Sequence, residues 1–249
     1  MAARHAAVRL SRTVARESLA ESAHSPAFSR GPLHRESRDC EPPEFFHGLL
    51  DSAAMSVDAL RTTIEESIAT KQRLLAQCLP QIQQLCDLAI RTLRQGGKIL
   101  FCGNGGSSCD AAHAAGELLG TFEDKTRKGY AAIALGQEVP ALTAIANDMG
   151  YEHVFSRQVE AIGRVGDLLI GYSTSGSSKN VVAALRVARE LGIATAVLTG
   201  ERKGPCSELA DVAILVPSTN TARIQESHLL CSHLMCAAVE QALSAERRG

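Results

Sequence analysis

Residues 98–120, KILFCGNGGSSCDAAHAAGELLG, contain the pattern on which the predicted fold rests. The apolar run at 99–102 is typical of a buried parallel strand. A glycine turn follows at 103–106, and an alanine-rich helical stretch begins at Ser107. Glycines let a backbone approach a ligand closely, and the N-terminus of a helix offers free N–H groups to an anion. This strand–turn–helix unit therefore predicts a phosphate-binding loop.

The rest of the chain alternates strand and helix in the same way. Apolar runs predict strands at 99–102, 131–135, 168–172, 195–198 and 212–216. Helical patterns occupy 107–121, 137–146, 152–162, 180–191 and 222–243. Such alternation implies right-handed crossovers and a parallel sheet with helices on both faces. The predicted fold is a doubly wound α/β domain with a five-stranded parallel sheet.

Residues 56–97, ahead of the sheet, have a helical pattern that Pro80 interrupts. Proline fits the first turn of a helix, because its missing N–H costs nothing there. The pattern therefore favours an N-terminal helical hairpin, and one long helix kinked at Pro80 is the alternative. Either arrangement leaves an apolar face for packing on another subunit.

Residues 1–54 differ in composition from the rest, with many Arg, Ser, His and Pro residues and no sustained periodicity. We expect a disordered tail, or an upstream extension of a protein that starts at Met55. The arginines also resemble an organellar transit peptide, but Glu17 and Glu21 weaken that interpretation. A single domain is expected over 55–249.

The composition excludes several classes of protein. A formal net charge of -1 in 249 residues and an aromatic content of 4% argue against nucleic-acid binding. No apolar run is long enough to span a membrane. The eight cysteines include no C-x-x-C pair, which favours reduced thiols in a cytoplasmic protein.

A second loop that is rich in hydroxyl groups, STSGSS at 173–178, follows the third predicted strand. Ligands of doubly wound sheets bind at the carboxyl ends of the strands. Two polar loops at such ends favour a phosphate ligand over two ordinary helix caps. A dinucleotide is disfavoured, because Ser108 takes the place of the third glycine of the G-x-G-x-x-G pattern.

Ionisable side chains on two predicted helices are candidates for chemistry. His113 and Glu117 share one helical face, and such a pair suits zinc binding or proton transfer. Gln225 and His233 lie about 12 Å apart along a helix axis and about 80° apart around it, which is wide for two ligands of one metal unless the side chains converge. His228 is a poorer partner for His233 by angle, and a structural role is more typical of such a residue.

Five motifs, taken together, resemble the sedoheptulose 7-phosphate isomerase (phosphoheptose isomerase) family of sugar-isomerase (SIS) domains. They are G-N-G-G-S at 103–107, H-x-x-x-E at 113–117, N-D at 147–148, S-T-S-G-x-S at 173–178, and R-I-Q-E at 223–226 with the later His233. The resemblance extends from about residue 56 to residue 243.

The resemblance implies interconversion of sedoheptulose 7-phosphate and D-glycero-D-manno-heptose 7-phosphate through a cis-enediolate, the first step of heptose precursor synthesis for lipopolysaccharide. It implies a homotetramer with sites at subunit interfaces and one zinc ion per subunit, bound by His113, Glu117, Gln225 and His233. The implied substrate contacts are Asn104, Gly105, Gly106, Ser107, Asn147, Asp148, Ser173, Thr174, Ser175, Ser178 and Gln225.

The implied catalytic residues are Glu117 and His233. Glu117 would move the carbon-bound proton, and His233 would handle the proton on oxygen. A carboxylate bound to a metal is a weaker base, so Glu117 either loosens from the metal during turnover or serves as ligand and base in different states.

A non-catalytic protein of the same fold is the alternative, either a sugar-phosphate sensor or a relative of the replication-initiator-associating protein. Some family members have Asp where Ala222 stands and His where Ser108 stands, and the initiator-associating protein also has Ala at the first of these positions. That relative lacks the carboxylate and the second histidine, whereas this chain keeps Glu117 and His233. The resemblance therefore favours the enzyme.

Overall fold

The computed structural model describes residues 55–245, and the predictions for residues 1–54 lie outside this range. The helices are α1 (Val57–Arg94), α2 (Gly106–Leu119), α3 (Val139–Met149), the 3-10 helix η2 (Tyr151–His153), α4 (Ser156–Ile162), α5 (Lys179–Glu190), α6 (Pro205–Leu209) and α7 (Thr221–Ala245). The strands are β1 (Ile99–Gly103), β2 (Ala132–Ala134), β3 (Leu168–Ser173), β4 (Ala194–Thr199) and β5 (Val212–Leu215).

The five strands form a parallel sheet in the order β2-β1-β3-β4-β5. Ile99 of β1 lies opposite Ala132 of β2 on one side and Leu168 of β3 on the other, so β1 is an interior strand. Both β1 and β3 are buried along their whole length, which explains their uninterrupted apolar sequences. The predicted α/β fold with a five-stranded parallel sheet is confirmed.

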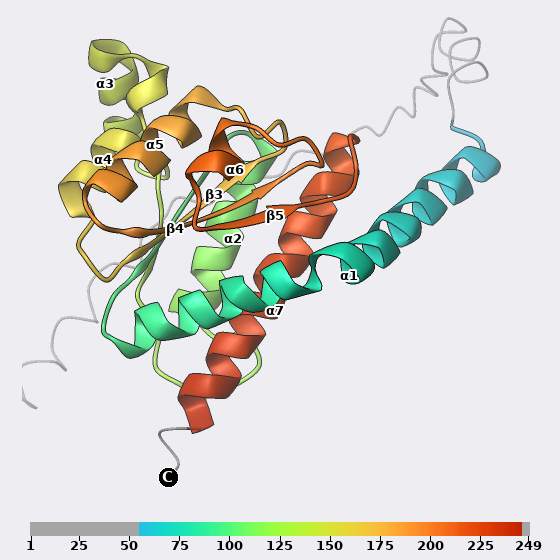
Figure 1. Cartoon of the computed structure of the whole chain (residues 1–249), viewed down its shortest axis with the longest axis horizontal. Helices are drawn as coiled ribbons and strands as arrows, with labels where there is room; N and C mark the ends of the chain where they lie inside the picture. Colours follow the sequence, from blue (N-terminus) through green and yellow to red (C-terminus); the bar gives the residue numbers. More distant parts are fainter. Residues whose placement is uncertain (1–54, 246–249) are drawn as a thin grey trace, which may run out of the picture. The chain divides into compact units, whose positions relative to one another are not determined.

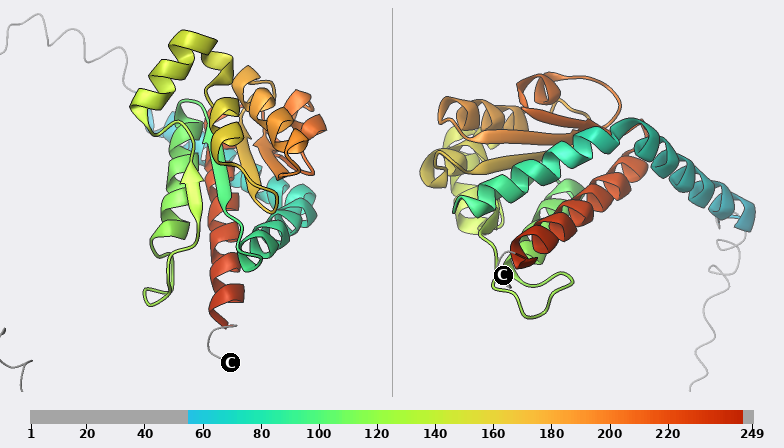
Figure 2. Two further views of the ribbon diagram at one scale, coloured as in Figure 1. Left: turned by 90° about the vertical axis from the view of Figure 1, so that its left-hand side faces the viewer. Right: turned by 60° about the horizontal axis from the view of Figure 1, so that its bottom comes forward.

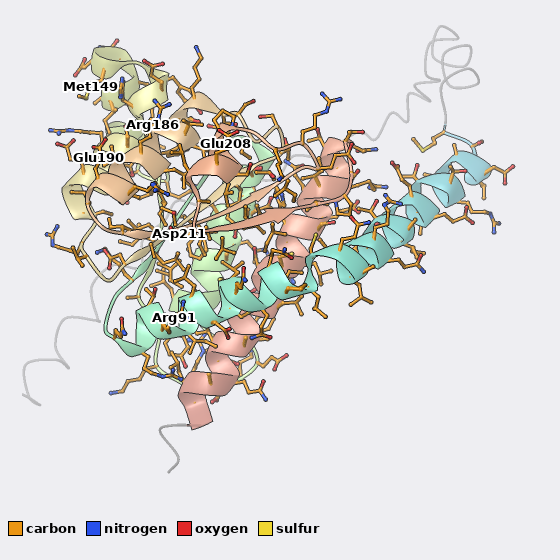
Figure 3. The ribbon with its side chains drawn as sticks, in the orientation of Figure 1. Arg91, Met149, Arg186, Glu190, Glu208 and Asp211 are labelled. Carbon is orange, nitrogen blue, oxygen red and sulfur yellow. The ribbon has the colours of Figure 1, made fainter. Side chains whose placement is uncertain are left out.

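Helices cover both faces of the sheet (Figure 1). One face packs against α1, α2 and α7 around Phe101 and Ile170, and the other packs against α4, α5 and α6 around Leu100 and Leu169. Figure 3 accordingly shows Arg91 of α1 and Arg186 of α5 on opposite sides of the sheet. The loops that leave β1 and β3 therefore meet at one edge, with a helix of each layer beginning there.

The expected helical hairpin is wrong, because residues 57–94 form the single helix α1 with Pro80 inside it. Its buried side chains continue in one stripe across the proline, from Leu74 and Cys78 to Ile82 and Leu85. A proline removes one backbone hydrogen bond and bends a helix, but packing of a continuous stripe outweighs that loss. Figure 2 shows the bend in α1, so the kinked alternative is the correct one.

The structure differs from the prediction in two other helical segments. The helix expected at 152–162 is divided into η2 and α4, and the short helix α6 was not predicted. Pro205 occupies the first turn of α6, a position that favours helix initiation and was the available signal. Neither difference affects the loops after β1 and β3, which meet at the carboxyl ends of the strands. Within residues 55–245, no helix is both long and apolar enough to cross a membrane.

Candidate functional site

The glycine turn after β1 has a backbone that side chains would obstruct. A Cβ atom on Gly103 would lie 2.5 Å from the carbonyl oxygen of Ser107. Gly105 has φ +55°, in the left-handed region that favours glycine. Ser107 is buried at the start of α2, and the Ser108 hydroxyl donates to the carbonyl of Gly105 at 2.7 Å. The N–H groups of Ser107 and Ser108 donate to the carbonyls of Asn104 and Gly105, each at 3.0 Å, so the start of α2 and the turn form one hydrogen-bonded unit.

The second loop, after β3, is ordered by its own hydroxyl groups. Ser173 Oγ and Ser178 Oγ lie 2.8 Å apart, and Ser175 Oγ accepts from the N–H of Ser177 at 3.3 Å. The amides of Asn104 and Asn180 exchange hydrogen bonds of 2.9 and 2.7 Å, which join the two loops. Sequence reasoning missed Asn180, because only the tertiary structure places this helical residue against the glycine turn.

Clefts border the second loop on more than one side. A cleft of about 420 Å³ is lined by Thr174 and Ser175 together with Gly200 and Ser218, from the loops after β4 and β5. A second cleft, of about 520 Å³, is lined by Asn104, Tyr151, Glu152, Ser178, Lys179 and Asn180, among others. Predicted substrate-contacting residues therefore line both clefts.

Three of the predicted metal ligands meet between α2 and α7. His113 Nε2 lies 3.0 Å from Glu117 Oε1 and 3.1 Å from His233 Nε2. One ligand atom from each side chain falls within 4.8 Å of the other two. His113 is exposed, while Glu117 and His233 are half-buried. Two imidazole nitrogens and a carboxylate oxygen that converge in this way are a donor set suited to Zn²⁺.

Gln225 and the Asn147–Asp148 pair do not join this cluster in the described chain. Gln225 lies against the start of α2, where a Cβ on Gly106 would be 2.5 Å from its Nε2. That position is about 10 Å along α2 from His113, by helical rise. Asn147 and Asp148 are exposed at the end of α3, and the Asn147 amide donates to the Asp148 carboxylate at 2.8 Å.

A buried polar group on α7 packs against β3 and β4. His228 is fully buried, with its ring 5.9 Å from that of Tyr172 and its Nε2 3.3 Å from the carbonyl oxygen of Thr199. Burial lowers the pKa of His228 to about 4, although the Thr199 contact opposes this shift. Burial also raises the pKa of Asp110 to about 6, against the opposing charge of His113. The complete burial of His228 agrees with the structural role that its sequence context suggested.

His228 is expected to destabilise the protein in acid. Its pKa is lower in the folded state than the ordinary 6.5, so the unfolded chain binds the proton first. Above pH 6.5 His228 is neutral in both states and does not lower the free energy of unfolding. As the pH falls from 6.5 to 4, the free energy of unfolding decreases by about 3 kcal/mol. Unfolding free energies of wild type and His228→Gln should be measured across this range.

The difference between the two proteins isolates His228 from Asp110. The pKa of Asp110 is raised from 3.8 to about 6, so between these pH values Asp110 makes the free energy of unfolding increase as the pH falls. This contribution is the same in both proteins and cancels in their difference. A pH-independent difference between wild type and His228→Gln would contradict the prediction.

Comparison with known proteins identifies close relatives. A model of the SIS domain family matches residues 62–200. The phosphoheptose isomerase of Roseiflexus sp. (strain RS-1) is 49% identical over 183 residues, which cover 74% of this chain and 92% of that protein. The solved phosphoheptose isomerase of Neisseria gonorrhoeae is 42% identical, with a TM-score of 0.70, and covers 74% of this chain and 98% of its own. The solved phosphoheptose isomerase of Francisella tularensis is 34% identical, with a TM-score of 0.73, and the match covers 76% of this chain and 100% of that protein.

Proposed function

This chain belongs to the phosphoheptose isomerase family of SIS-domain proteins, and on that premise we propose that it interconverts sedoheptulose 7-phosphate and D-glycero-D-manno-heptose 7-phosphate. The chain is an isomerase of this family. The reaction would supply the aldoheptose phosphate for heptose precursors of lipopolysaccharide.

The convergence of His113, Glu117 and His233 carries this proposal. The three side chains come from α2 and α7, and α2 begins at the glycine turn that predicts phosphate binding. An aldose–ketose isomerase needs groups that exchange protons at carbon and at oxygen beside a bound sugar phosphate. The cluster offers proton-exchanging groups on two packed helices, and the turn that predicts phosphate binding begins the same helix α2.

Zinc is the proposed cofactor, with His113, Glu117 and His233 as ligands from this cluster and Gln225 as a fourth. Bound Zn²⁺ would supply Lewis-acid polarisation of the sugar oxygens. Catalytic zinc sites typically have three protein ligands and leave a position for substrate or water, and the three converging side chains match that number.

Glu117 and His233 divide the proton transfers in the proposed mechanism. The Glu117 carboxylate removes the proton from one of the two carbons adjacent to oxygen and returns it to the other, through a cis-enediolate. His233 moves the proton between the two oxygens. In the same proposal, hydroxyl groups of Ser173, Thr174 and Ser175 hold the phosphate.

A cytoplasmic homotetramer with sites at subunit interfaces is part of the proposal. Large apolar side chains are exposed along the N-terminal half of α1, including Val57, Leu60, Ile64 and Ile68. Association of subunits through this row would bury them. The described cysteines are free thiols, in keeping with a reducing compartment.

The decisive experiment is a turnover assay. Purified protein supplied with Zn²⁺ and sedoheptulose 7-phosphate is expected to produce the aldoheptose 7-phosphate, which NMR distinguishes from the ketose. Binding of the sugar phosphate without turnover would instead favour the non-catalytic sensor.

A further inference from the structure

A buried ion pair lies where the end of α2 meets α7. Arg127, in the loop after α2, donates from Nε to the carboxylate of Glu240 on α7. The side chains are only 2% and 5% exposed. Charges taken this far out of water are costly unless further hydrogen bonds satisfy their remaining donors and acceptors.

The guanidinium group of Arg127 bonds to the helix that carries Glu117. Its Nη2 donates to the carbonyl oxygen of Glu117 at 2.5 Å, and its Nη1 donates to that of Leu118 at 3.0 Å. The last carbonyls of a helix have no partner within the helix, and α2 has no basic residue in its own last turn. Arg127 donates to both carbonyls from outside the helix, and the Tyr130 N–H also donates to that of Leu118 at 2.9 Å. These bonds fix the backbone of Glu117.

The carboxylate of Glu240 also holds the segment 122–124, which contacts His233 through Phe122. It accepts hydrogen bonds from the backbone N–H groups of Phe122, Glu123 and Asp124. The Phe122 ring lies 5.6 Å from the ring of His233, centroid to centroid. Burial alone would raise the pKa of Glu240, but Arg127 and the three N–H groups hold it below its ordinary value.

His233 and Glu240 lie on the same face of α7. Glu240 follows His233 by seven residues, which is within about 20° of two full turns. One carboxylate therefore reaches Glu117 through Arg127 and reaches His233 through the Phe122 segment. We propose that Glu240 and Arg127 are positioning residues, which together hold Glu117 and His233 at the separation that the metal site and the proton transfers require.

Two conservative variants test the proposal, which rests on the proposed function. Arg127→Lys keeps the charge but loses the planar fork that reaches two carbonyls. Glu240→Gln keeps an acceptor for the N–H groups but loses the ion pair. We expect each variant to fold by circular dichroism, to bind Zn²⁺ about 10–100-fold more weakly in competition with a chromophoric chelator, and to lower kcat by a similar factor with KM unchanged.

Asp167→Asn is the matched control. The Asp167 carboxylate is 4% exposed, pairs with Lys98 at 2.5 Å and accepts from the N–H groups of Lys98 and Arg164. It lies immediately before β3, and the partners of its carboxylate, Lys98 and Arg164, belong neither to the His113–Glu117–His233 cluster nor to the Arg127–Glu240 pair. This variant should lose stability but keep wild-type zinc affinity and kcat.

The outcomes separate the positioning proposal from the proposed function. Folded Arg127→Lys and Glu240→Gln proteins with wild-type zinc affinity and kcat would overturn it, as would an equal loss in Asp167→Asn. If the wild type binds zinc but does not isomerise the sugar phosphate, the proposed function fails, and the zinc affinities alone decide the positioning role. A wild type that binds no zinc would overturn both.

Discussion

Glu117→Gln is expected to lower kcat by about 10²–10⁴-fold while the protein stays folded. Glutamine has nearly the same shape but cannot accept the carbon-bound proton, and a positioned base contributes an acceleration of this order. The kinetic assay should be combined with exchange of the substrate proton for solvent deuterium, because that exchange reports the enediolate directly. A fully active Glu117→Gln protein would contradict the assignment of the base.

Zinc content of the same variant separates the two roles of Glu117. Retained zinc with lost exchange assigns the carboxylate as the base, whereas lost zinc assigns it as a necessary ligand. Glu160→Gln is the control, because Glu160 is an exposed carboxylate on α4 that pairs only with Arg157 among the described side chains. That variant should match the wild type in both measurements.

Removal of metal is expected to have a comparably large effect. Dialysis against a chelator should abolish turnover, and one equivalent of Zn²⁺ per chain should restore it, because the sugar oxygens lose their Lewis acid. Zinc should also raise the melting temperature, since a ligand at 100 times its Kd stabilises the folded state by about 2.7 kcal/mol. Full activity of the chelated protein would contradict the zinc proposal.

His113→Gln provides the residue-level version of this experiment. It should prevent both the recovery of activity and the zinc-dependent rise in melting temperature. His153→Gln is the matched control, because His153 is a half-exposed imidazole beside Glu152 on η2 and lies outside the cluster. Equal loss in both variants would point to a general effect of removing a histidine.

The sheet could be predicted because its signal is local. The apolar runs of β1 and β3 and the turn at Gly103 appear directly in the sequence, and burial on both faces explains them. The helical hairpin failed for the opposite reason. Pro80 is a local signal for a helix start, but the stripe from Leu74 to Leu85 that packs across it is recognisable only in the folded protein.

The candidate site could be predicted only where its residues share a helix. His113 and Glu117 are one turn apart on α2, so their contact follows from helical geometry. The wide spacing calculated for Gln225 and His233 agrees with their separate positions in the structure, and the four-ligand zinc set stays a prediction. Arg127 and Glu240 gave no signal, because a charged residue in a sequence is usually at the surface.

Because α7 packs beside α2, the spacing of residues along the two helices determines which side chains meet at the site. Gln225 touches the start of α2 at Gly106, and eight residues later His233 reaches His113, seven residues along α2. One residue inserted between Gln225 and His233 would advance the second contact by about 1.5 Å and rotate it by about 100°, away from α2. The interval between these two residues is therefore a length that the chain cannot change without dismantling the cluster.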